Sequence, residues 1–278
     1  MEYILYNGKF LQAGEAILSP DSRALRFGDG LFETLKSNKG ILELADEHFS
    51  RLWKGLQILQ FTLPNHFTAV KLKEEIVNLL KKNAHQDVAR VRITIFRSNG
   101  GLYDALDHTP NYLVQTWALP GQTGNWNSNG LVLGVYTDVQ KSCDMVSNLK
   151  HNNFLPYVMA ALHAQKQKWN DALILNSAGR LCDSTIANIF FTKDEAIFTP
   201  ALTEGCIAGI VRKHVINSIA GKFNIVEGEF TVDDLLAADE IFLTNSIHNI
   251  RWVQTFGDRK YGNSFTQKIY ASVFSTKA

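Results

Sequence analysis

Apolar and polar residues alternate over the first 118 residues in a way that predicts short strands and two amphipathic helices. Strand-like segments end in turn formers, as where Tyr3–Tyr6 is followed by Asn7-Gly8, a pair typical of a tight hairpin. Apolar residues recur at helical spacing in two stretches, which predicts helices over 46–59, with Asp46 as N-cap, and over 67–82. The apolar stripe of the second helix would contain Val70, Ile76, Val77 and Leu80. Strands are expected at 3–6, 10–11, 31–36, 41–44, 88–96 and 112–117.

A polar, turn-rich stretch from Pro120 to Gly130 interrupts this pattern and is typical of an interdomain linker. Beyond it, the pattern predicts helices over 153–168, 209–220 and 264–274, and strands at 131–136, 172–175, 189–192, 196–198, 223–229 and 240–243. Strands and helices do not follow a regular βαβ order, which favours the α+β class over a doubly wound sheet. We therefore expect two α+β domains, a smaller one over residues 1–118 and a larger one over 131–278, joined by a linker over 119–130.

Composition and charge exclude several classes of protein. The 28 basic and 27 acidic residues leave a net charge of +1, without the basic excess of a dedicated nucleic-acid-binding protein. Three scattered cysteines (Cys143, Cys182 and Cys206) provide neither a disulfide framework nor CxxC zinc spacing, and the eight histidines form no HxH or HExxH motif. No apolar run reaches the ~18 residues of a membrane span, and the first residues lack the pattern of a signal peptide. We expect a cytoplasmic protein with no metal, nucleic-acid or membrane partner.

Several polar segments could carry chemistry, and each also has an ordinary structural explanation. Gly28-Asp29-Gly30 superficially resembles a phosphate loop, but a strand rather than a helix follows it, which favours a tight turn. The segment from Gly205 to Gly209 leads into an amphipathic helix whose first N–H groups could cradle a phosphate, as at any helix start. Lys150 lies in a polar patch, where lysines are usually solvated. A desolvated lysine could instead form a Schiff base with a carbonyl cofactor.

Asp183 and Asn188 precede an apolar strand and could form an ordinary turn in which the side chains bond their own backbone. Asp183 could instead be a buried carboxylate that faces a cationic ring nitrogen. A lysine, a carboxylate, a helix start and a second polar turn at Leu243-Thr244-Asn245-Ser246 follow one another along the chain. Together they supply what pyridoxal phosphate requires, namely an imine partner, a counter-charge for its ring and donors to its phosphate.

With these residues in this order, the chain resembles the class IV aminotransferase family, also called the fold-type IV PLP enzymes. That family includes branched-chain aminotransferases, D-amino acid aminotransferases and aminodeoxychorismate lyases. The resemblance rests on ordered motifs along nearly the whole chain: RALRFGDGLFETLK, EHFSRL, SNLKHNNFL, GRLCDSTIANIFF, TPALTEGCIAGIVR and DEIFLTNSI. It implies the two-domain α+β fold of D-amino acid aminotransferases, pyridoxal 5′-phosphate as cofactor, a small amino substrate and a homodimer.

The resemblance also implies roles for individual residues. Lys150 would be the catalytic Schiff-base lysine and would move the proton between the substrate Cα and the cofactor. Asp183 would face the pyridine nitrogen where the family usually has glutamate, and its side chain is shorter by one methylene, which puts the reaction rate in doubt. Arg51, whose position off the apolar stripe would otherwise indicate a solvated side chain, would bind the cofactor phosphate. The other cofactor-binding residues would be Asn188, Ile207, Gly209, Ile210, Val211, Asn245 and Ser246.

Two reactions remain open within the resemblance. Branched-chain aminotransferases usually have tyrosine at the position of Phe27, and D-amino acid aminotransferases at the position of Phe32. The segment from Arg97 to Tyr103 is similar to a glycine-rich loop of the lyases, although it could be no more than a flexible loop between strands. These features favour an aminodeoxychorismate lyase, which eliminates pyruvate and gives 4-aminobenzoate. The alternatives are an amino-acid transaminase of branched-chain or D-amino acid type and a catalytically weak PLP-binding protein. The implied substrate-binding residues are Phe27, Phe32, Thr34, Arg92, Arg97 and Tyr103.

Overall fold

The chain forms two units in the computed structural model, which describes residues 2–15 and 17–274. Unit 1 comprises Met1–Thr123 together with Leu149–Asn153, and unit 2 comprises Gly124–Asn148 together with Phe154–Ala278. Two segments therefore lie elsewhere than the sequence indicates. Leu149–Asn153 belongs to unit 1 and not to the larger domain expected over residues 131–278. Residues 124–130 of the expected linker belong to unit 2.

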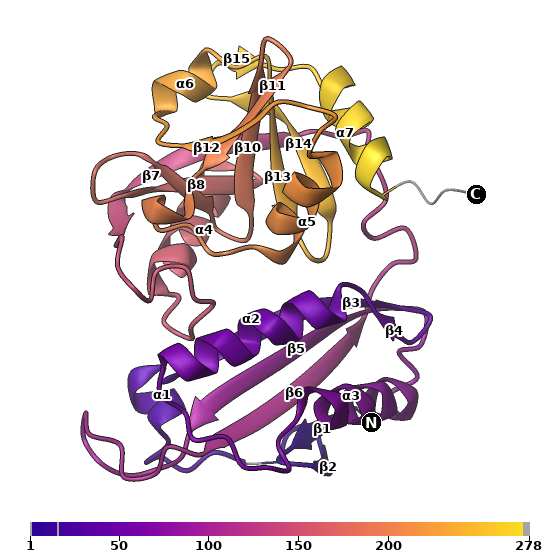
Figure 1. The fold of residues 1–278 in the computed structure, drawn as a ribbon, viewed down its shortest axis with the longest axis vertical. Helices are drawn as coiled ribbons and strands as arrows, with labels where there is room; N and C mark the ends of the chain where they lie inside the picture. Colours follow the sequence, from indigo (N-terminus) through magenta and orange to yellow (C-terminus); the bar gives the residue numbers. More distant parts are fainter. Residues whose placement is uncertain (1, 16, 275–278) are drawn as a thin grey trace. The chain divides into compact units, whose positions relative to one another are not determined.

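Unit 1 is built on an antiparallel sheet that has six strands within the described residues (Figure 1). The order across the sheet is β2-β1-β6-β5-β3-β4, so the longest strands lie at its centre. Helices α2 (Ala45–Ile58) and α3 (Ala69–Lys82) pack against this sheet, and the short helix α1 (Arg23–Phe27) precedes its third strand. The strands are β1 (Tyr3–Tyr6), β2 (Lys9–Gln12), β3 (Gly30–Asn38), β4 (Ile41–Leu42), β5 (Val88–Arg97) and β6 (Pro110–Ala118).

The two faces of this sheet differ in character because successive side chains of a strand point to opposite sides. Leu31, Leu35 and Ile93 are fully or almost fully buried, on the face that also holds the packed helices. Thr34 and Arg92 are register partners on the opposite face and are only half-buried. One face of the sheet is therefore buried under the helices, and the other carries half-buried polar side chains such as Thr34 and Arg92.

Two details of the predicted helices in unit 1 are wrong. Helix α2 begins at Ala45 after Leu44, which takes a left-handed conformation (φ 48°), so Asp46 lies in the first turn and not at the N-cap. There its charge still interacts favourably with the helix dipole. In α3 the side chain of Val70 is 69% exposed. The buried stripe consists of Leu72, Ile76, Leu79 and Leu80.

Unit 2 is built on a larger sheet that closes on itself. Strands β10, β13, β14, β7, β8 and β9 follow one another, and β9 pairs back onto β10 where Asp183 meets Asn188. Strands β11 and β12 extend the sheet beyond β10, and β15 pairs with β14. The strands are β7 (Leu131–Lys141), β8 (Asp171–Asn176), β9 (Leu181–Ser184), β10 (Asn188–Lys193), β11 (Ala196–Pro200), β12 (Ile225–Gly228), β13 (Glu240–Asn245), β14 (Asn249–Phe256) and β15 (Arg259–Lys260).

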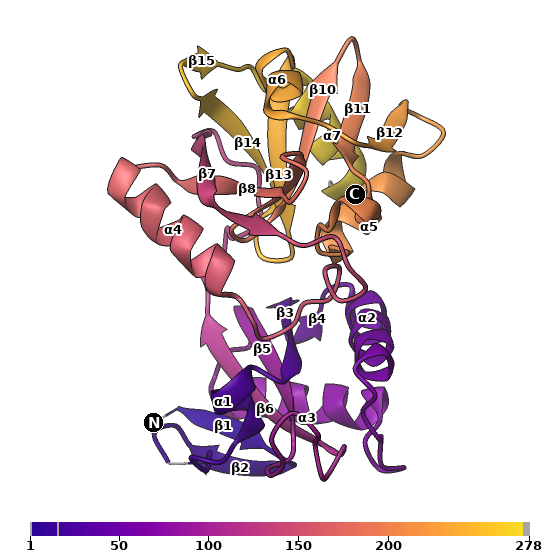
Figure 2. The ribbon, with the colours of Figure 1, turned by 90° about the vertical axis from the view of Figure 1, so that its left-hand side faces the viewer.

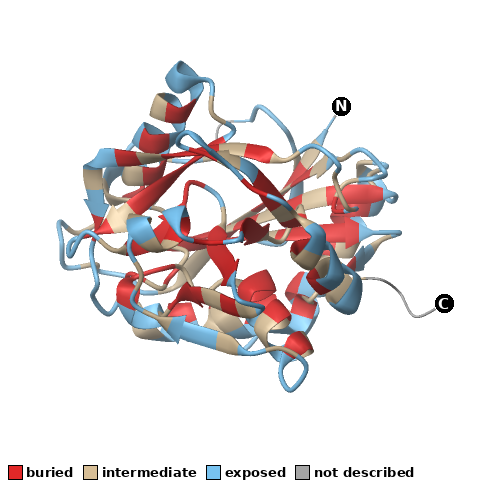
Figure 3. Cartoon of the chain, turned by 90° about the horizontal axis from the view of Figure 1, so that it is seen from above, coloured by how far each residue is buried: buried red, intermediate tan, exposed pale blue. Residues whose placement is uncertain are grey.

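Helices cover unit 2 from different sides. Helix α4 (Leu155–Gln167) packs on β7 and β8, whereas α5 (Ile210–Ile219) and α7 (Ser264–Phe274) pack on β13 (Figure 2). A 3₁₀ turn (Leu202–Glu204) and the short helix α6 (Val232–Leu236) lie between strands. Buried residues concentrate in the strands and on the inward sides of helices (Figure 3). In the described part of the chain, no helix combines the length and the apolarity that crossing a membrane would require.

Candidate active site

The segment that carries Lys150 is attached to the start of β3 by backbone hydrogen bonds. Phe32 N donates to Lys150 O over 2.8 Å, and Asn152 N donates to Gly30 O over 3.0 Å. The side chain of Asn152 adds a bond from Nδ2 to Ile95 O, at 3.3 Å. The backbone of Lys150 is therefore held on the sheet of unit 1, although residues on both sides of its segment belong to unit 2.

The two glycines of the Gly28-Asp29-Gly30 motif make room for this segment. A Cβ on Gly30 would lie 2.0 Å from Ile95 O and 2.7 Å from the Asn152 amide nitrogen. Gly28 has φ +62° at the end of α1, and a Cβ there would lie 2.4 Å from Asn153 Oδ1. The tight turn expected from the sequence is present at Gly28. Gly30 is required by the close approach of two backbones, so the motif is no phosphate loop.

The Lys150 amine and the half-buried Arg92 guanidinium both lie beside the ring of Phe32. Lys150 Nζ is 4.3 Å from the centre of the Phe32 ring, and Arg92 Cζ is 4.0 Å from the same centre. Arg92 Nε donates to Thr94 Oγ1 at 3.2 Å. Burial, with a contribution from the neighbouring Arg90, lowers the pKa of the Arg92 guanidinium. The structure thus brings the predicted residues Lys150, Phe32 and Arg92 together, with Thr34 beside Arg92 in register.

Arg51 is held by a buried carboxylate that sequence reasoning missed. Arg51 Nε donates to Glu33 Oε1 at 2.7 Å, and Arg51 Nη2 donates to Glu33 Oε2 at 2.6 Å. His48 Nδ1 lies 2.7 Å from Glu33 Oε2. The side chain of Arg51 is only 14% exposed, so the solvated position that the apolar pattern indicates is wrong. The only signal in the sequence that could have indicated Glu33 is its charge, which stands on the buried face of a strand.

Glu33 is ionised in this environment. Burial by itself would raise its pKa, but the charges of Arg51 and His48 and their hydrogen bonds outweigh burial and lower the pKa to about 2. An ionised carboxylate can only accept hydrogen bonds, so His48 Nδ1 carries the proton in this contact. The bidentate pair fixes the plane of the Arg51 guanidinium, which a single contact could not do.

The guanidinium of Arg97 is hydrogen-bonded to other groups of the protein and is not exposed to a cavity. Its Nε donates to Asp29 Oδ2 at 3.0 Å, its Nη2 to Leu59 O at 2.5 Å and its Nη1 to Gln60 O at 3.3 Å. Its Nη1 also lies 3.0 Å from His108 Nδ1. Arg97 thus joins the end of α2, the turn before β3 and His108, and the predicted substrate contact gains no support from this geometry.

Phe27 and Tyr103, two further predicted substrate residues, lie together at the same end of unit 1. Their ring centres are 5.8 Å apart, and the Arg23 guanidinium stacks 5.0 Å from the centre of the Phe27 ring. Arg23 also pairs with Asp29 at 2.8 Å and donates to Leu102 O at 2.6 Å. Arg23 thus connects the loop that follows β5 to Asp29, at the turn before β3.

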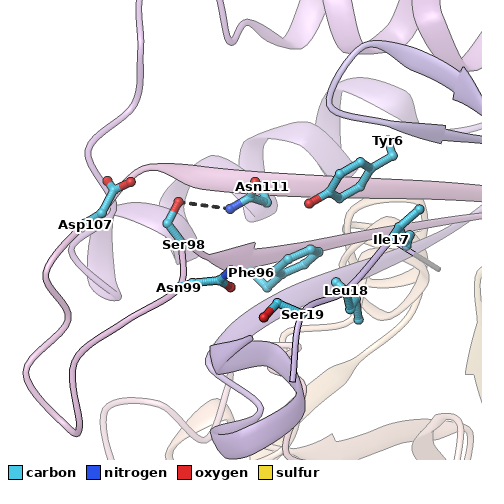
Figure 4. A pocket seen from close by; sticks show the side chains of 9 residues that line it. All are labelled: Tyr6, Ile17, Leu18, Ser19, Phe96, Ser98, Asn99, Asp107 and Asn111. Carbon is cyan, nitrogen blue, oxygen red and sulfur yellow. Dashed lines mark hydrogen bonds between the residues drawn. The ribbon is translucent and has the colours of Figure 1, made fainter. Parts of the chain in front are cut away.

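A cavity of about 340 Å³ opens beside the ends of β5 and β6 (Figure 4). Asn111 Nδ2 donates to Ser98 Oγ at 3.0 Å across its wall. Its described lining consists of Tyr6, Ile17, Leu18, Ser19, Phe96, Ser98, Asn99, Asp107 and Asn111, and it contains none of the predicted site residues. The cavity therefore adds nothing to the candidate site.

Asp183 lies inside a cage of donors in unit 2. Its Oδ2 accepts hydrogen bonds from Lys141 Nζ at 2.8 Å, from the Tyr157 hydroxyl at 3.0 Å and from Ile207 N at 2.9 Å. Its Oδ1 accepts one from Asn188 Nδ2 at 2.9 Å. The carboxylate is only 2% exposed. The structure brings the predicted residues Asp183, Asn188 and Ile207 together and adds Lys141 and Tyr157, for which the sequence offered no signal.

The charges in this cage are one anion and one cation. Burial alone would lower the pKa of Lys141, but the attraction of Asp183 outweighs burial and the pKa is raised, so the side chain is an ammonium. Burial and the charge of Asp183 raise the pKa of Tyr157 well above its ordinary value, so the phenol stays neutral. Lys141 and Asp183 therefore form a buried salt bridge.

The start of α5 supplies a second element of the candidate site. Gly209 occupies the N-cap position and no side chain caps the helix there. A Cβ on Gly209 would lie 1.8 Å from Asn188 Oδ1, so only glycine allows this packing. The first N–H groups of a helix, here those of Ile210 and Val211, have no acceptor within the helix and suit an anion such as a phosphate.

Asn245 is the last residue of β13, and Ser246 lies in the turn that follows it before β14. Asn245 Oδ1 accepts hydrogen bonds from Ile247 N at 3.0 Å and from His248 N at 2.8 Å, which holds the turn. Asn188 is the register partner of both Asp183 and Thr244. The predicted turn and the caged carboxylate therefore lie on adjoining strand ends of unit 2.

Comparisons with known proteins agree on the kind of protein. Residues 30–256 match the family model described as amino-transferase class IV. The chain is 29% identical over 228 residues to an aminodeoxychorismate lyase of Vibrio harveyi, covering 81% of this chain and 82% of that protein. An aminodeoxychorismate lyase structure from Pseudomonas aeruginosa is similar with a TM-score of 0.83 at 23% identity, covering 99% of each chain. A PLP-bound hypothetical aminotransferase from Mycobacterium tuberculosis is similar with a TM-score of 0.82 at 18% identity, covering 99% and 100%.

These structural similarities confirm the expected fold. They extend over nearly the whole chain and include both units. The two-domain α+β fold that the motifs imply is therefore present, with an antiparallel sheet in unit 1 and the closed sheet in unit 2.

Proposed function

The chain belongs to the class IV aminotransferase family, whose members are enzymes, and we propose that it is a pyridoxal 5′-phosphate-dependent enzyme in which Lys150 holds the cofactor. The observation that carries the proposal is the attachment of the Lys150 backbone to the start of β3, with the Lys150 amine beside the Phe32 ring. The PLP-bound structure among the similar proteins supports the choice of cofactor.

The donor groups that the chain offers fit this cofactor. The amine of Lys150 suits an aldehyde, and the guanidinium of Arg51, oriented by Glu33, suits a phosphate. The first N–H groups of α5 suit a phosphate, and the carboxylate of Asp183 suits a ring nitrogen. When bound, pyridoxal phosphate supplies an electron sink that makes the Cα proton of an amino substrate acidic.

The chain's own residues would then move one proton and orient the substrate. The amine of Lys150 removes the proton at the substrate Cα and can return it to another atom. The Phe32 ring and the backbone bonds of its segment limit where this amine can reach. Arg92 and Thr34, which are register partners with half-buried side chains, would bind a substrate carboxylate.

We propose aminodeoxychorismate lyase activity, in which pyruvate is eliminated and 4-aminobenzoate is formed. The name of the Vibrio relative, the Pseudomonas structure and the lyase-like loop from Arg97 to Tyr103 support it. The alternative is a transaminase of branched-chain or D-amino acid type. Against it, Phe27 replaces the tyrosine usual in the branched-chain enzymes, and Phe32 replaces the tyrosine usual in the D-amino acid enzymes. Retention of Lys150 argues against a protein that only binds the cofactor.

The cofactor proposal is tested by absorption spectroscopy. Purified protein incubated with pyridoxal 5′-phosphate should show a visible band, and Lys150→Ala should abolish it. Lys166→Ala, an exposed lysine of α4, is the matched control and should keep the band. Protein that stays colourless and cannot be reconstituted with the cofactor contradicts the proposal.

The reaction is tested by two assays in parallel. One offers aminodeoxychorismate with a pyruvate-coupled readout and no oxo acid, and the other offers amino acids with 2-oxoglutarate. Pyruvate release without an acceptor supports the lyase. Product that forms only with 2-oxoglutarate identifies a transaminase.

We further propose that the protein is cytoplasmic and that it forms a homodimer, the latter as the family resemblance implies. Size-exclusion chromatography should show a species of about twice the 31.2 kDa chain mass. A species of the single chain mass alone would contradict the dimer.

A further inference from the structure

We propose that Arg90 binds a second carboxylate of the substrate, beside the one that Arg92 and Thr34 would bind, so that the enzyme selects amino compounds with two carboxylates. This inference rests on the proposed function and deepens it, because it names the class of substrate that the Lys150 amine would serve. Aminodeoxychorismate belongs to this class, since it carries two carboxylates, whereas a branched-chain amino acid carries one.

Arg90 and Arg92 lie on the same face of the sheet in unit 1. Side chains two residues apart in a strand point to the same side and are separated by about 7 Å along the strand. Thr34 is the register partner of Arg92, and it follows Phe32 by two residues in β3. The Phe32 ring lies beside the Lys150 amine. Along this face, Arg92 therefore comes first from the amine and Arg90 comes next.

The two arginines lack the acidic partners that other arginines of unit 1 have. Arg92 Nε donates to the neutral hydroxyl of Thr94 at 3.2 Å. Among the described residues, no carboxylate forms an ion pair with Arg90 or Arg92, although both side chains are half-buried. The arginines of unit 1 that do pair with a carboxylate are Arg23, Arg51 and Arg97.

The guanidinium of Arg90 is oriented by an aromatic ring and keeps hydrogen-bonding capacity. Its Cζ lies 5.0 Å from the ring centre of Trp117, which is its register partner in β6. Within the described part of the chain, its Nε is buried and has no hydrogen-bond partner. A guanidinium in contact with an indole can still donate from its edge. Because an unsatisfied buried donor costs free energy, an oxygen of a ligand that accepts from this edge would be stabilising.

The charges on this face favour an anion with two negative groups. Burial, followed by the charge of Arg90, lowers the pKa of the Arg92 guanidinium. Lys36, the register partner of Arg90, is a third cation and is paired with Glu43 at 3.0 Å. The two arginines repel each other, and a dicarboxylate would replace this repulsion with two charge-assisted contacts. A monocarboxylate could compensate only one of them.

Two probes of the same shape test the inference by equilibrium binding. Holoenzyme prepared with pyridoxal 5′-phosphate is titrated in a calorimeter with terephthalate and with 4-carbamoylbenzoate, in which an uncharged amide replaces one carboxylate. We expect the wild-type protein to bind terephthalate about tenfold more tightly. Equal affinities for the two probes, or no binding of terephthalate, would overturn the proposal. This comparison needs no variant, so it decides the proposal even if a variant does not fold.

Variants of Arg90 assign the preference to this side chain. Arg90→Met keeps a long side chain against Trp117 without the charge and should abolish the preference, whereas Arg90→Lys should retain part of it. Lys73→Met, at an exposed lysine of α3, is the matched control, because it also removes one positive charge from unit 1. It should retain the full preference. An unchanged preference in Arg90→Met contradicts the role assigned to Arg90.

The kinetics of the lyase reaction provide a second readout. With aminodeoxychorismate, Arg90→Met should raise KM about tenfold and change kcat little, since the lost contact is made equally to substrate and transition state. A fall in kcat at unchanged KM speaks against a binding role. Failure of the proposed function is distinguishable, because it leaves the wild-type protein without the visible band that depends on Lys150. Failure of this inference alone leaves the band and removes only the preference for two carboxylates.

Discussion

Units 1 and 2 each contain a buried carboxylate beside a basic side chain, and the two carboxylates are used in opposite ways. Both oxygens of Glu33 are taken up by the Arg51 guanidinium and the His48 ring, so the acid orients the base. At Asp183 the donors are an ammonium, a phenol, an amide and a backbone N–H, which together orient the acid. Glu33 is thus shared by two side chains, whereas Asp183 is shared by three side chains and one backbone N–H.

The first test of this comparison is Glu33→Gln, which has the largest expected effect. Removing one member of a buried charge pair leaves the other buried and uncompensated, which costs about 3–5 kcal/mol of unfolding free energy. Denaturation in urea measures it. Glu47→Gln, on the exposed side of α2, is the control and should change stability by less than about 0.5 kcal/mol. A loss at Glu33 as small as that of the control would mean that Arg51 is not held by this carboxylate.

Acid should weaken the Glu33 cluster in a defined pH range. Its pKa falls from the ordinary 4.5 to about 2 in the folded protein, so the unfolded chain binds the proton more readily. The corresponding stabilisation, about 3 kcal/mol, is complete above pH 4.5 and is lost as the pH falls toward 2. The stability difference between the wild-type protein and Glu33→Gln, measured across this range, should shrink on acidification. A difference that does not depend on pH would contradict the ionised pair.

Gly30→Ala tests the attachment of the Lys150 segment and should have an intermediate effect. The new Cβ would collide with the Ile95 carbonyl, and such overpacking costs about 1–3 kcal/mol. The visible band that depends on Lys150 should weaken as well. Gly121→Ala is the matched control, because a Cβ there meets nothing within 4 Å. Equal stability and equal absorbance of the two variants would contradict the close approach.

Tyr157→Phe has the smallest expected effect in the comparison. Asp183 keeps its other three donors, so the loss should be near the ordinary value of one hydrogen bond, about 1 kcal/mol. Urea denaturation measures this change. A loss as large as that of Glu33→Gln would show that the donors at Asp183 are not shared as described.

The sequence by itself determined most of the regular structure, because helical and strand periodicity is a local property of the chain. The helix over residues 264–274 has the predicted bounds, and most longer elements lie within a few residues of theirs. Short elements such as α1, α6 and β9 were missed. Strand β14 was missed too, although it has eight residues. It pairs with the neighbouring β13 and with the distant β7, and only the pairing with β7 has no local trace in the sequence.

The sequence also predicted Lys150, Arg51 and Asp183 as candidate site residues, through the motifs that carry the family resemblance. Only the tertiary structure decided their partners. Glu33 lies 18 residues from Arg51, and Lys141 lies 42 residues from Asp183. A buried charge needs a partner, but which side chain reaches it depends on how distant strands and helices pack, and no local pattern encodes that choice.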